Sequence, residues 1–387
     1  MKLSKKMSNL PEQFFAKLSQ NVANAVAQGR DVINLGQGNP DRPTPAHIIE
    51  AMQQATADAS MHKYSPFRGT VELKEAIAQF YKREYDVDID PNREVAVLFG
   101  AKAGLVELPM VLLDDGDTML LPDPGYPDYL SGVALANINF ETMPLVAENA
   151  FLPDYSKLTD VQKQAAKLLY INYPNNPTGA VATPAFFDET VQFARDNDIA
   201  VMHDFAYGSL GFDGVKPPSF LQAAGAKEVG VEFYTLSKTY NMAGWRVGFA
   251  VGNAEIIEGL NLIQDHLYCS LFPAIQHAAA VALTSPQDCV VEQLAIYEQR
   301  RNTLKRAAES IGWHIDVPAG SFFAWLPVPK GMTSAQFADI LLEKADVAVA
   351  DGNGFGPHGE GYVRVGLLVD DARIEEAMKR IATLNLF

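Results

Sequence analysis

Short apolar segments recur through the middle of the chain, and helix-like stretches separate several of them. The segments are 94–100, 118–124, 167–174, 199–205, 231–237 and 246–252. The stretch "PAFFDETVQFARDND" at 184–198 is one of the amphipathic connections. Strands that are apolar on both faces and are followed by helices form mostly parallel sheets with helices on both sides. We therefore expect an α/β fold for this part of the chain.

The C-terminal part has a different pattern. A long helical segment at 287–311 is followed by "SFFAWLPV", a helix at 333–344, "DVAVA", "YVRVGLL" and a last helix that begins at 371. This succession predicts a smaller α+β unit. The N-terminal stretch "LPEQFFAKLSQNVANAVAQG" is amphipathic, and we expect it to join the small unit or to reach another subunit. The predicted domains are a large one at 46–285, and a small one formed by 1–45 together with 286–387.

Charge and cysteine content limit the partners and the compartment. The 387-residue chain has a formal net charge of −16, which argues against nucleic acid or an anionic membrane as a partner. It shows no signal-peptide pattern and no apolar run of the roughly 18 residues that a membrane span needs. The two cysteines, Cys269 and Cys289, form no disulfide framework and fit a reducing compartment. The sequence therefore predicts a cytoplasmic protein without nucleic-acid or membrane partners.

Polar residues stand at or just past the ends of the predicted strands, where parallel sheets bind ligands. They are Tyr126, Asn175, Asn176, Asp204, Tyr207, Thr235, Ser237 and Lys238, and the small-residue turn "AKAGL" opens a helix after the first segment. Lys238 is unusual, because most lysines lie on solvated surfaces whereas this one lies between apolar runs. It is either an ordinary loop residue or a lysine whose amine takes part in chemistry. Arg246 follows it eight residues later.

This set of residue types matches the needs of a pyridoxal phosphate site. A lysine amine forms a Schiff base with the aldehyde, and a buried carboxylate keeps the ring nitrogen protonated. A phenol and an amide can hydrogen-bond the ring oxygen, and an aromatic face can stack on the ring. Backbone N–H groups at a helix start, hydroxyls and an arginine can bind the phosphate.

Several longer motifs resemble those of the class I/II aminotransferases of fold type I. They are "GQGNPDRPTP", "YSPFRGTVELKEA", "PDPGYPDY", "NYPNNPTG", "DFAYG", "TLSKTYNMAGWRVG" and "GEGYVRVGLL", in the family's order over residues 30–370. The resemblance implies a large domain with a mostly parallel seven-stranded sheet between helices, and a smaller α+β domain. It also implies a pyridoxal phosphate-dependent transaminase that exchanges an amino group between an L-amino acid and a 2-oxo acid by a ping-pong mechanism.

The resemblance assigns the cofactor ring to five residues. Lys238 would hold the cofactor as a Schiff base and later move the substrate's α-proton. Asp204 would pair with the ring nitrogen, Tyr207 and Asn176 would hydrogen-bond the ring oxygen, and Tyr126 would stack on the ring. The catalytic residues implied are thus Lys238, Asp204 and Tyr207. The simpler alternatives are a helix cap for Asp204, a turn role for Asn176 and a core position for Tyr126.

The phosphate is assigned, by the same resemblance, to Arg246, Thr235, Ser237 and the turn at Ala101 and Lys102. Thr235 stands where serine is frequent, and Ala101 stands where glycine or serine is frequent. These two departures affect the details of phosphate binding and not its existence.

Other roles concern the substrate and a second subunit. Tyr64 would reach the phosphate of the partner subunit, so that a homodimer with shared active sites is implied. Arg364 would bind the substrate α-carboxylate, with Asn176 and the backbone near Gly38 assisting. For Arg364 the alternative is the polar face of a strand, because it alternates with apolar residues in "YVRVGLL".

The substrate side chain is expected to be neutral. Members of the family that bind dicarboxylates use a second arginine in the segment after the lysine strand, but no Lys or Arg occurs between Arg246 and Arg300 here. That segment offers Tyr268, Leu271 and Phe272, and a distal carboxylate would stay unpaired beside them. Aspartate is therefore a poor candidate.

Within the family, several runs are similar to members that serve methionine salvage. The runs "REVAVLFGAKAGLVELP", "LPDPGYPDYLSGVALA", "HDFAYGSLGFDG" and "IQDHLYCSLFPAIQ" carry this similarity. It implies amination of 4-methylthio-2-oxobutanoate to methionine, with glutamine as the donor. Other neutral amino acids, alanine or LL-diaminopimelate remain alternatives, as does a carbon–sulfur lyase of the same fold. A cofactor-binding regulator is a further alternative, which the acidic composition disfavours.

Two other kinds of site can be set aside. The segment "GFGPHG" at 354–359 matches G-x-G-x-x-G, but a strand-like run follows it, whereas a dinucleotide site requires a helix there. The seven histidines show no metal-ligand spacing, so we expect no metal site.

Overall fold

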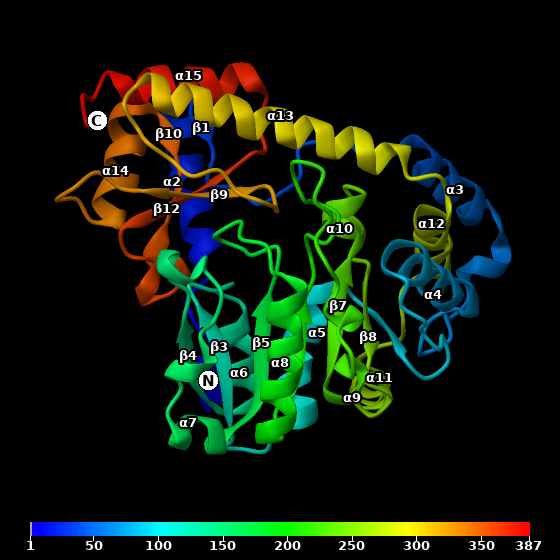
Figure 1. The fold of residues 1–387 in the computed structure, drawn as a ribbon. Helices are drawn as coiled ribbons and strands as arrows, with labels where there is room; N and C mark the ends of the chain where they lie inside the picture. The colour runs from blue at the N-terminus through cyan, green and yellow to red at the C-terminus, as the bar shows by residue number, and fades with distance from the viewer. Residues whose placement is uncertain (1) are drawn as a thin grey trace.

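A seven-stranded sheet lies in the larger part of the molecule (Figure 1). The computed structural model describes residues 2–387. The strands are β2 (Val95–Leu98), β3 (Thr118–Asp123), β4 (Asn139–Pro144), β5 (Ala166–Asn172), β6 (Ala200–Asp204), β7 (Gly230–Thr235) and β8 (Gly248–Gly252). Their order in the sheet is β2-β8-β7-β6-β5-β3-β4, and only β8 runs antiparallel to its neighbours. The α/β class and the mostly parallel sheet are confirmed.

All six predicted strands are present, and the sequence analysis missed one. The missed strand β4 lies at the edge of the sheet, and its residues are mostly exposed. Because β4 buries little surface, it lacks the continuous apolar pattern of the other strands, whereas β2 at the opposite edge is buried. The segment 231–237 also ends earlier than predicted, since β7 stops at Thr235 and the short helix α10 (Leu236–Thr239) follows.

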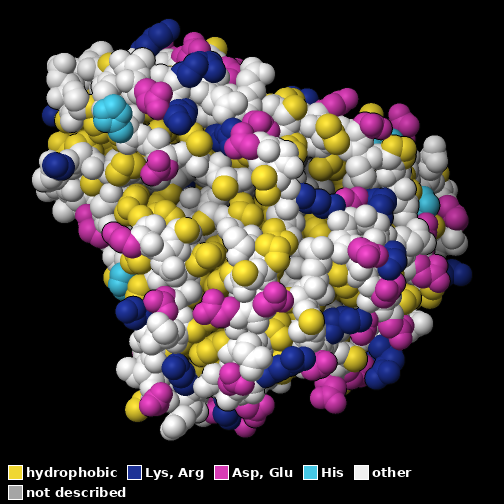
Figure 2. All heavy atoms as spheres, in the orientation of Figure 1, with side chains coloured by type: hydrophobic (Ala, Val, Ile, Leu, Met, Phe, Trp, Pro, Cys, Tyr) yellow, Lys and Arg dark blue, Asp and Glu magenta, His cyan; other side chains and the backbone are white. Residues whose placement is uncertain are grey.

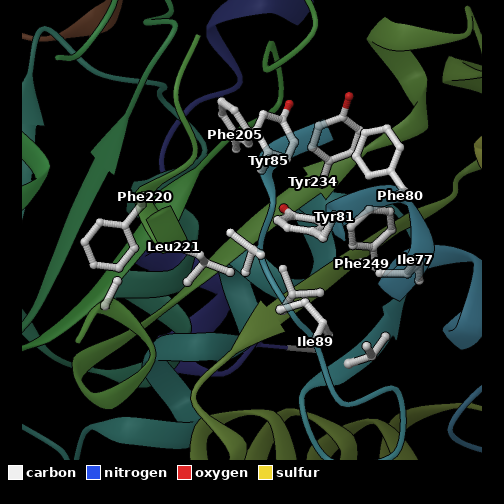
Figure 3. Close-up of a cluster of buried hydrophobic side chains, with 14 of the residues drawn as sticks. Ile77, Phe80, Tyr81, Tyr85, Ile89, Phe205, Phe220, Leu221, Tyr234 and Phe249 are labelled. Atoms are coloured by element: carbon white, nitrogen blue, oxygen red, sulfur yellow. The ribbon is translucent and has the colours of Figure 1, made fainter. Parts of the chain in front are cut away.

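Helices cover both faces of the sheet. On one face pack α4 (Val71–Tyr85), α8 (Pro184–Asn197) and α12 (Pro273–Thr284), and on the other face pack α5 (Ala101–Leu112), α6 (Tyr129–Ala136) and α11 (Ala254–Leu267). Side chains of β5 alternate between the two cores: Leu169 and Ile171 face the first, and Leu168 and Tyr170 face the second. Figure 3 shows the aromatic part of the first core, which includes Tyr81 of α4.

A second unit is built from the C-terminal part and the N-terminal segment. It contains the antiparallel strands β11 (Ala350–Asp351), β12 (Tyr362–Gly366) and β9 (Phe323–Pro327), and a parallel pair of β1 (Ile33–Asn34) with β10 (Val347–Ala348). Its helices are α13 (Asp288–Ser310), α14 (Ser334–Ala345) and α15 (Asp371–Ala382). The run "DVAVA" therefore contributes to two strands, β10 and β11, where the sequence suggested one.

The N-terminal helix α2 (Phe14–Ala27) lies with this second unit. Phe14 and Phe15 contact Phe355 edge-to-face at ring-centroid distances of 5.5 and 5.9 Å. Asp41 forms an ion pair of 2.7 Å with Arg300 of α13. These contacts join the N-terminal segment to the C-terminal part, and the predicted division into domains at 45/46 and 285/286 remains a prediction. Figure 1 shows α13 extending from the second unit toward α3 (Ala46–Ala57) and α12.

The remaining helices are short, and the surface is mixed in charge. They are α1 (Lys5–Ser8), α7 (Asp160–Ala165) and α9 (Ala226–Val229), with 3-10 turns between other elements. Figure 2 shows acidic and basic side chains interspersed on one face, with hydrophobic side chains gathered in the middle. Within residues 2–387, every helix is too short or too polar to cross a membrane.

The core of the second unit supports a stability prediction. Leu304 of α13 is fully buried in that core, whereas Val291 on the same helix is 67% exposed. Replacing Leu304 by Ala removes buried methyl groups and leaves a cavity, so the free energy of unfolding should fall by about 2–5 kcal/mol. The matched control Val291→Ala should change it by about 0.5 kcal/mol or less. Urea denaturation of both variants measures the difference, and equal effects would contradict the packing described here.

Candidate active site

A cavity of about 520 Å³ opens at the carboxyl ends of the parallel strands. It lies where ligands bind in open α/β sheets. Of the predicted site residues, those that line it are Gly38, Ala101, Lys102, Tyr126, Asn176, Asp204, Tyr207, Thr235, Ser237, Lys238, Arg246 and Arg364. Tyr64 lies outside this cavity, with 90% of its side chain exposed. The structure therefore brings together every predicted site residue except the one assigned to a partner subunit.

Lys238 projects into the cavity from α10. Thr235 ends β7 and caps this helix, because its hydroxyl accepts a hydrogen bond of 3.2 Å from the backbone N–H of Ser237. The Lys238 ammonium donates to the carbonyl oxygen of Gly38 at 3.0 Å. Burial lowers the pKa of Lys238 to about 8, and the charges of Arg364 and Arg246 act in the same direction. The amine is therefore available in its neutral, nucleophilic form close to neutral pH.

Asp204 ends β6 and is fully buried. Its Oδ2 accepts a hydrogen bond of 2.8 Å from the hydroxyl of Tyr129, whereas its Oδ1 has no partner within residues 2–387. Burial raises the pKa of Asp204, and the Tyr129 hydrogen bond opposes this rise. A buried oxygen without a partner is rare in proteins, so this carboxylate is suited to accept a proton donor from a ligand.

The start of α5 and Arg246 form a second polar end of the cavity. Gly100, with φ of 78°, precedes α5, and a Cβ at this position would collide with the guanidinium of Arg246. Thr235 and Ser237 lie beside them, with their hydroxyls 2.9 Å apart. The first N–H groups of a helix have no partner inside the helix, and with an arginine and hydroxyls they bind phosphate well.

Lys102 is the one predicted phosphate residue whose side chain turns elsewhere. It lines the cavity, but its ammonium forms an ion pair of 2.8 Å with Asp128. The charge of Lys102 is therefore compensated within the chain. Its contribution to the anion end is limited to the backbone N–H at the start of α5, as for Ala101.

Arg364 lies at the centre of β12 and is almost fully buried. Its Nη1 donates to Asn176 Oδ1 at 2.9 Å, and its Nη2 donates to the carbonyl oxygen of Gly36 at 3.0 Å. The guanidinium lies 3.8 Å from the ring centroid of Phe323 and 4.9 Å from that of Phe15. Burial lowers the pKa of Arg364 to about 9, and its guanidinium donates to an amide and a backbone carbonyl rather than to a carboxylate.

Tyr207 and Tyr126 are enclosed by other rings. Tyr207 contacts Phe322 and Phe323 edge-to-face at centroid distances of 5.3 and 5.8 Å. Tyr126 contacts Tyr129 edge-to-face at 5.6 Å. Burial raises the pKa of both cavity phenols, which therefore keep their protons and can donate hydrogen bonds.

The positions and chemistry of these groups suit pyridoxal phosphate. The unpartnered Oδ1 of Asp204 suits a protonated ring nitrogen, and the buried amine of Lys238 suits an aldehyde. The close approach of Arg246 to Gly100 leaves a cationic recess beside a helix start, which suits a phosphate dianion.

Sequence reasoning missed three residues at this site. Tyr129 holds Asp204, and Asn172 donates 2.7 Å to the backbone carbonyl of Asp204 while accepting from the N–H of Asn176 at 2.8 Å. Asn172 was detectable as an amide inside an apolar strand run. Phe15 of α2 lines the cavity, although its segment precedes the sheet by about eighty residues of sequence. No sequence pattern near Phe15 predicts that it reaches this cavity.

The pocket wall that the sequence predicts is not formed by residues of the same subunit. Tyr268, Leu271 and Phe272 are absent from the cavity lining within residues 2–387. Tyr268 instead donates 2.8 Å to Glu107, and Leu271 is buried elsewhere. The apolar wall is formed by Phe15 and Leu18 of α2, with Phe323 of β9 and Leu105 of α5. The sequence that follows β7 gave no indication that the N-terminal helix α2 would form part of the apolar wall.

Known proteins match this chain over nearly its whole length. The sequence profile of "Aminotransferase class I and II" matches residues 30–381. The L-glutamine–4-(methylsulfanyl)-2-oxobutanoate aminotransferase of Bacillus subtilis is 65% identical over 98% of this chain and 96% of its own length. An LL-diaminopimelate aminotransferase of Moorella thermoacetica is 45% identical over 98% of both chains.

A solved structure agrees with these matches. The substrate-bound structure of BacF from Bacillus subtilis superposes with a TM-score of 0.96 at 46% identity, covering 100% of this chain and 98% of that one. The fold, the cavity and the sequence matches lead to the same family. The chain belongs to the class I and II aminotransferases, enzymes that depend on pyridoxal phosphate to move amino groups between amino acids and 2-oxo acids.

Proposed function

We propose that this aminotransferase converts 4-methylthio-2-oxobutanoate to methionine, with glutamine as the amino donor. The observation that carries the assignment of the chemistry is the pairing of a buried amine, Lys238, with the unpartnered carboxylate oxygen of Asp204 in one cavity. The substrate is proposed from the 65% identity to the Bacillus subtilis enzyme of that name and from the apolar wall of the cavity.

Lys238 is proposed to act as nucleophile and then as proton carrier. Bound in this cavity, pyridoxal phosphate supplies an aldehyde and an electron-withdrawing ring. The neutral amine of Lys238 would hold the cofactor's aldehyde, and as a free base it would take the proton from the substrate Cα and return it. Asp204 would accept a hydrogen bond from the ring nitrogen, and Tyr207 and Asn176 would hydrogen-bond the ring oxygen. Donor and acceptor use the same residues in turn, which gives ping-pong kinetics.

Arg364 is proposed to bind the α-carboxylate of both substrates. Its guanidinium is held by Asn176 and Gly36 and stacked on Phe323, so little freedom is lost when a carboxylate arrives. The carboxylate would supply the negative charge that the buried arginine lacks. Gly38 contributes its backbone beside this arginine, where a Cβ would lie 3.3 Å from the Phe323 ring.

The side-chain pocket favours an unbranched apolar chain. Phe15, Leu18 and Phe323 line the cavity near Arg364. A thioether is flexible and packs well against aromatic rings. Lys102 is a basic residue within reach of the cavity, but Asp128 already compensates its charge. A distal carboxylate would therefore compete with an existing ion pair.

We also propose that the active protein is a cytoplasmic homodimer. Tyr64 is largely exposed, and so are Phe67, Phe99 and Leu267. The loop of Phe67 is joined to α11 by Arg68, which pairs with Asp265 at 3.1 Å, and Leu267 ends that helix. Exposed apolar residues on connected elements are typical of an interface, and a second copy would cover them and bring its Tyr64 to this cavity.

The reactivity of Lys238 should follow its lowered pKa. In the cofactor-free protein, covalent trapping of Lys238 by pyridoxal phosphate and borohydride should increase with pH and level off above about 8, because only the neutral amine reacts. Peptide mass spectrometry measures the trapped fraction, and Lys238→Ala provides the control. A rate that still increases near pH 10 would show a solvated lysine. Lys238→Ala should also lose transamination by at least about 10³-fold.

The substrate proposal predicts a clear preference among amino acids. Methionine and glutamine should bleach the visible absorption band of the yellow enzyme, whereas aspartate should act at least about 100-fold more slowly, since its distal carboxylate lacks a free cation. Stopped-flow absorbance measures the three rates. If aspartate reacts rapidly, Lys102→Met should abolish that reaction and leave methionine unaffected. A rapid aspartate reaction would in any case overturn the preference for neutral substrates.

The shared site predicts complementation between two inactive variants. Lys238→Ala and Tyr64→Ala homodimers should each be impaired, the second through phosphate binding. After denaturation and refolding together, mixed dimers carry both defects in one site and an intact second site. Activity should then recover to about one quarter of wild type for equal amounts of chain, because about half of the dimers are mixed. No recovery would mean that Tyr64 acts within its own subunit or not at all.

A further inference from the structure

His203 lies directly before Asp204 in β6, on the opposite face of the sheet. We infer that His203 is held as a permanent imidazolium behind the active site, where its charge keeps Asp204 ionised for the cofactor's ring nitrogen. The protonation of His203 is independent of the cofactor, whereas its effect on the ring nitrogen rests on the proposed function. His203 is thus a positioning residue, since it acts through Asp204.

Both ring nitrogens of His203 face hydrogen-bond acceptors. Nδ1 lies 2.7 Å from Glu232 Oε2, and Nε2 lies 2.9 Å from the backbone carbonyl oxygen of Tyr173. A carbonyl oxygen only accepts, so Nε2 must carry a proton. A neutral imidazole would then present a bare Nδ1 to the carboxylate. Only the imidazolium donates at both positions.

Glu232 is surrounded by donors, which fixes it as the anion of the pair. Its Oε1 accepts from the hydroxyls of Tyr81 and Ser219 at 2.7 Å each, and its Oε2 also accepts from the backbone N–H of Phe220 at 2.8 Å. Burial and the charge of Glu232 raise the pKa of Tyr81, so this phenol keeps its proton. A carboxylate with donors at both oxygens stays ionised and leaves the proton on His203.

Aromatic rings seal this pair from water. His203 and Glu232 have no exposed surface, and the rings of Phe187 and Phe205 lie 5.0 Å from the imidazole centroid. Figure 3 shows Phe205 and Tyr81 among the buried aromatic side chains of this core. The charge cannot be screened by solvent here, so it acts at longer range than a surface charge would.

Asp204 adjoins His203 in sequence, and its buried Oδ1 has no hydrogen-bond partner within residues 2–387. Burial raises its pKa, while the Tyr129 hydrogen bond and the charges of His203 and Lys238 lower it. Lys238 loses its charge whenever its amine is neutral or covalently engaged. His203 keeps its charge throughout, because Glu232, Tyr81 and the Tyr173 carbonyl hold it on the other face of the sheet. The imidazolium is therefore the cation that stays constant during turnover.

The protonation state can be measured in the cofactor-free protein. With ¹⁵N-labelled histidine, NMR should show both ring nitrogens of His203 protonated from about pH 6 to about pH 9, whereas ordinary histidines change form between about pH 5 and 8. The variant His203→Gln identifies the signal by its loss. A neutral ring for His203 anywhere in this range overturns the inference. This result does not depend on whether the protein binds pyridoxal phosphate.

Two ligands separate a charge effect from a structural one. His203→Gln should bind pyridoxal phosphate about tenfold more weakly, the equivalent of one pKa unit at Asp204. Its affinity for the 1-deaza analogue, in which a carbon replaces the ring nitrogen, should stay as in wild type. Equal weakening for both ligands would mean a structural role and overturn the inference.

Matched variants complete the experiment. Glu232→Gln removes the anion with little change in shape and should let the His203 signal become neutral, which provides a second test if His203→Gln fails to fold. His277→Gln removes another histidine–glutamate pair, formed with Glu72 at 2.8 Å and partly exposed, and should change neither ligand affinity. If wild type binds neither ligand, the proposed function fails while the NMR result still decides the state of His203.

Discussion

Removal of water from charged groups is the constraint on which the active site depends. Arg364 and Lys238 are cations without a carboxylate partner among residues 2–387, and burial lowers the pKa of each. Such groups are costly unless an anion joins them. The cavity therefore carries positive charge that its own residues do not compensate, and a bound anion would balance it. A phosphate beside Arg246 and a carboxylate beside Arg364 would supply them, which explains why an acidic protein binds small anions.

The topology of the sheet determines which side chains meet. Parallel strands bring Asn176, Asp204 and Lys238 to one edge, because all three follow the ends of neighbouring strands. Arg246 reaches the same edge because it precedes an antiparallel strand instead of following a parallel one. Strand β8 runs antiparallel to β7 with Thr235 paired to Gly248, so the residues just before β8 lie where β7 ends. The single reversed strand thus places Arg246, the proposed phosphate ligand, near the lysine.

The same logic explains how far the sequence could predict the structure. The inner strands and the residues at their ends were predictable, because burial on both faces leaves a continuous apolar run that a polar residue interrupts. Strand β4 was not, since its side chains are mostly exposed and it has no such run. Phe15 and the ring cluster around Arg364 join segments that are more than three hundred residues apart in sequence. No local pattern encodes such contacts.

Phe15 lies where it would link the proposed carboxylate binding to the selection of the substrate side chain. Its ring lies 4.9 Å from the guanidinium of Arg364 and also lines the cavity. An amino acid that neutralises Arg364 with its carboxylate therefore places its side chain against the same aromatic cluster. An apolar side chain gains contact area there, whereas a charged one would lose hydration beside rings that cannot replace it. In the proposed function, recognition of the α-carboxylate and rejection of a distal charge would thus follow from one arrangement, in which Phe15 of the N-terminal helix packs on a buried arginine.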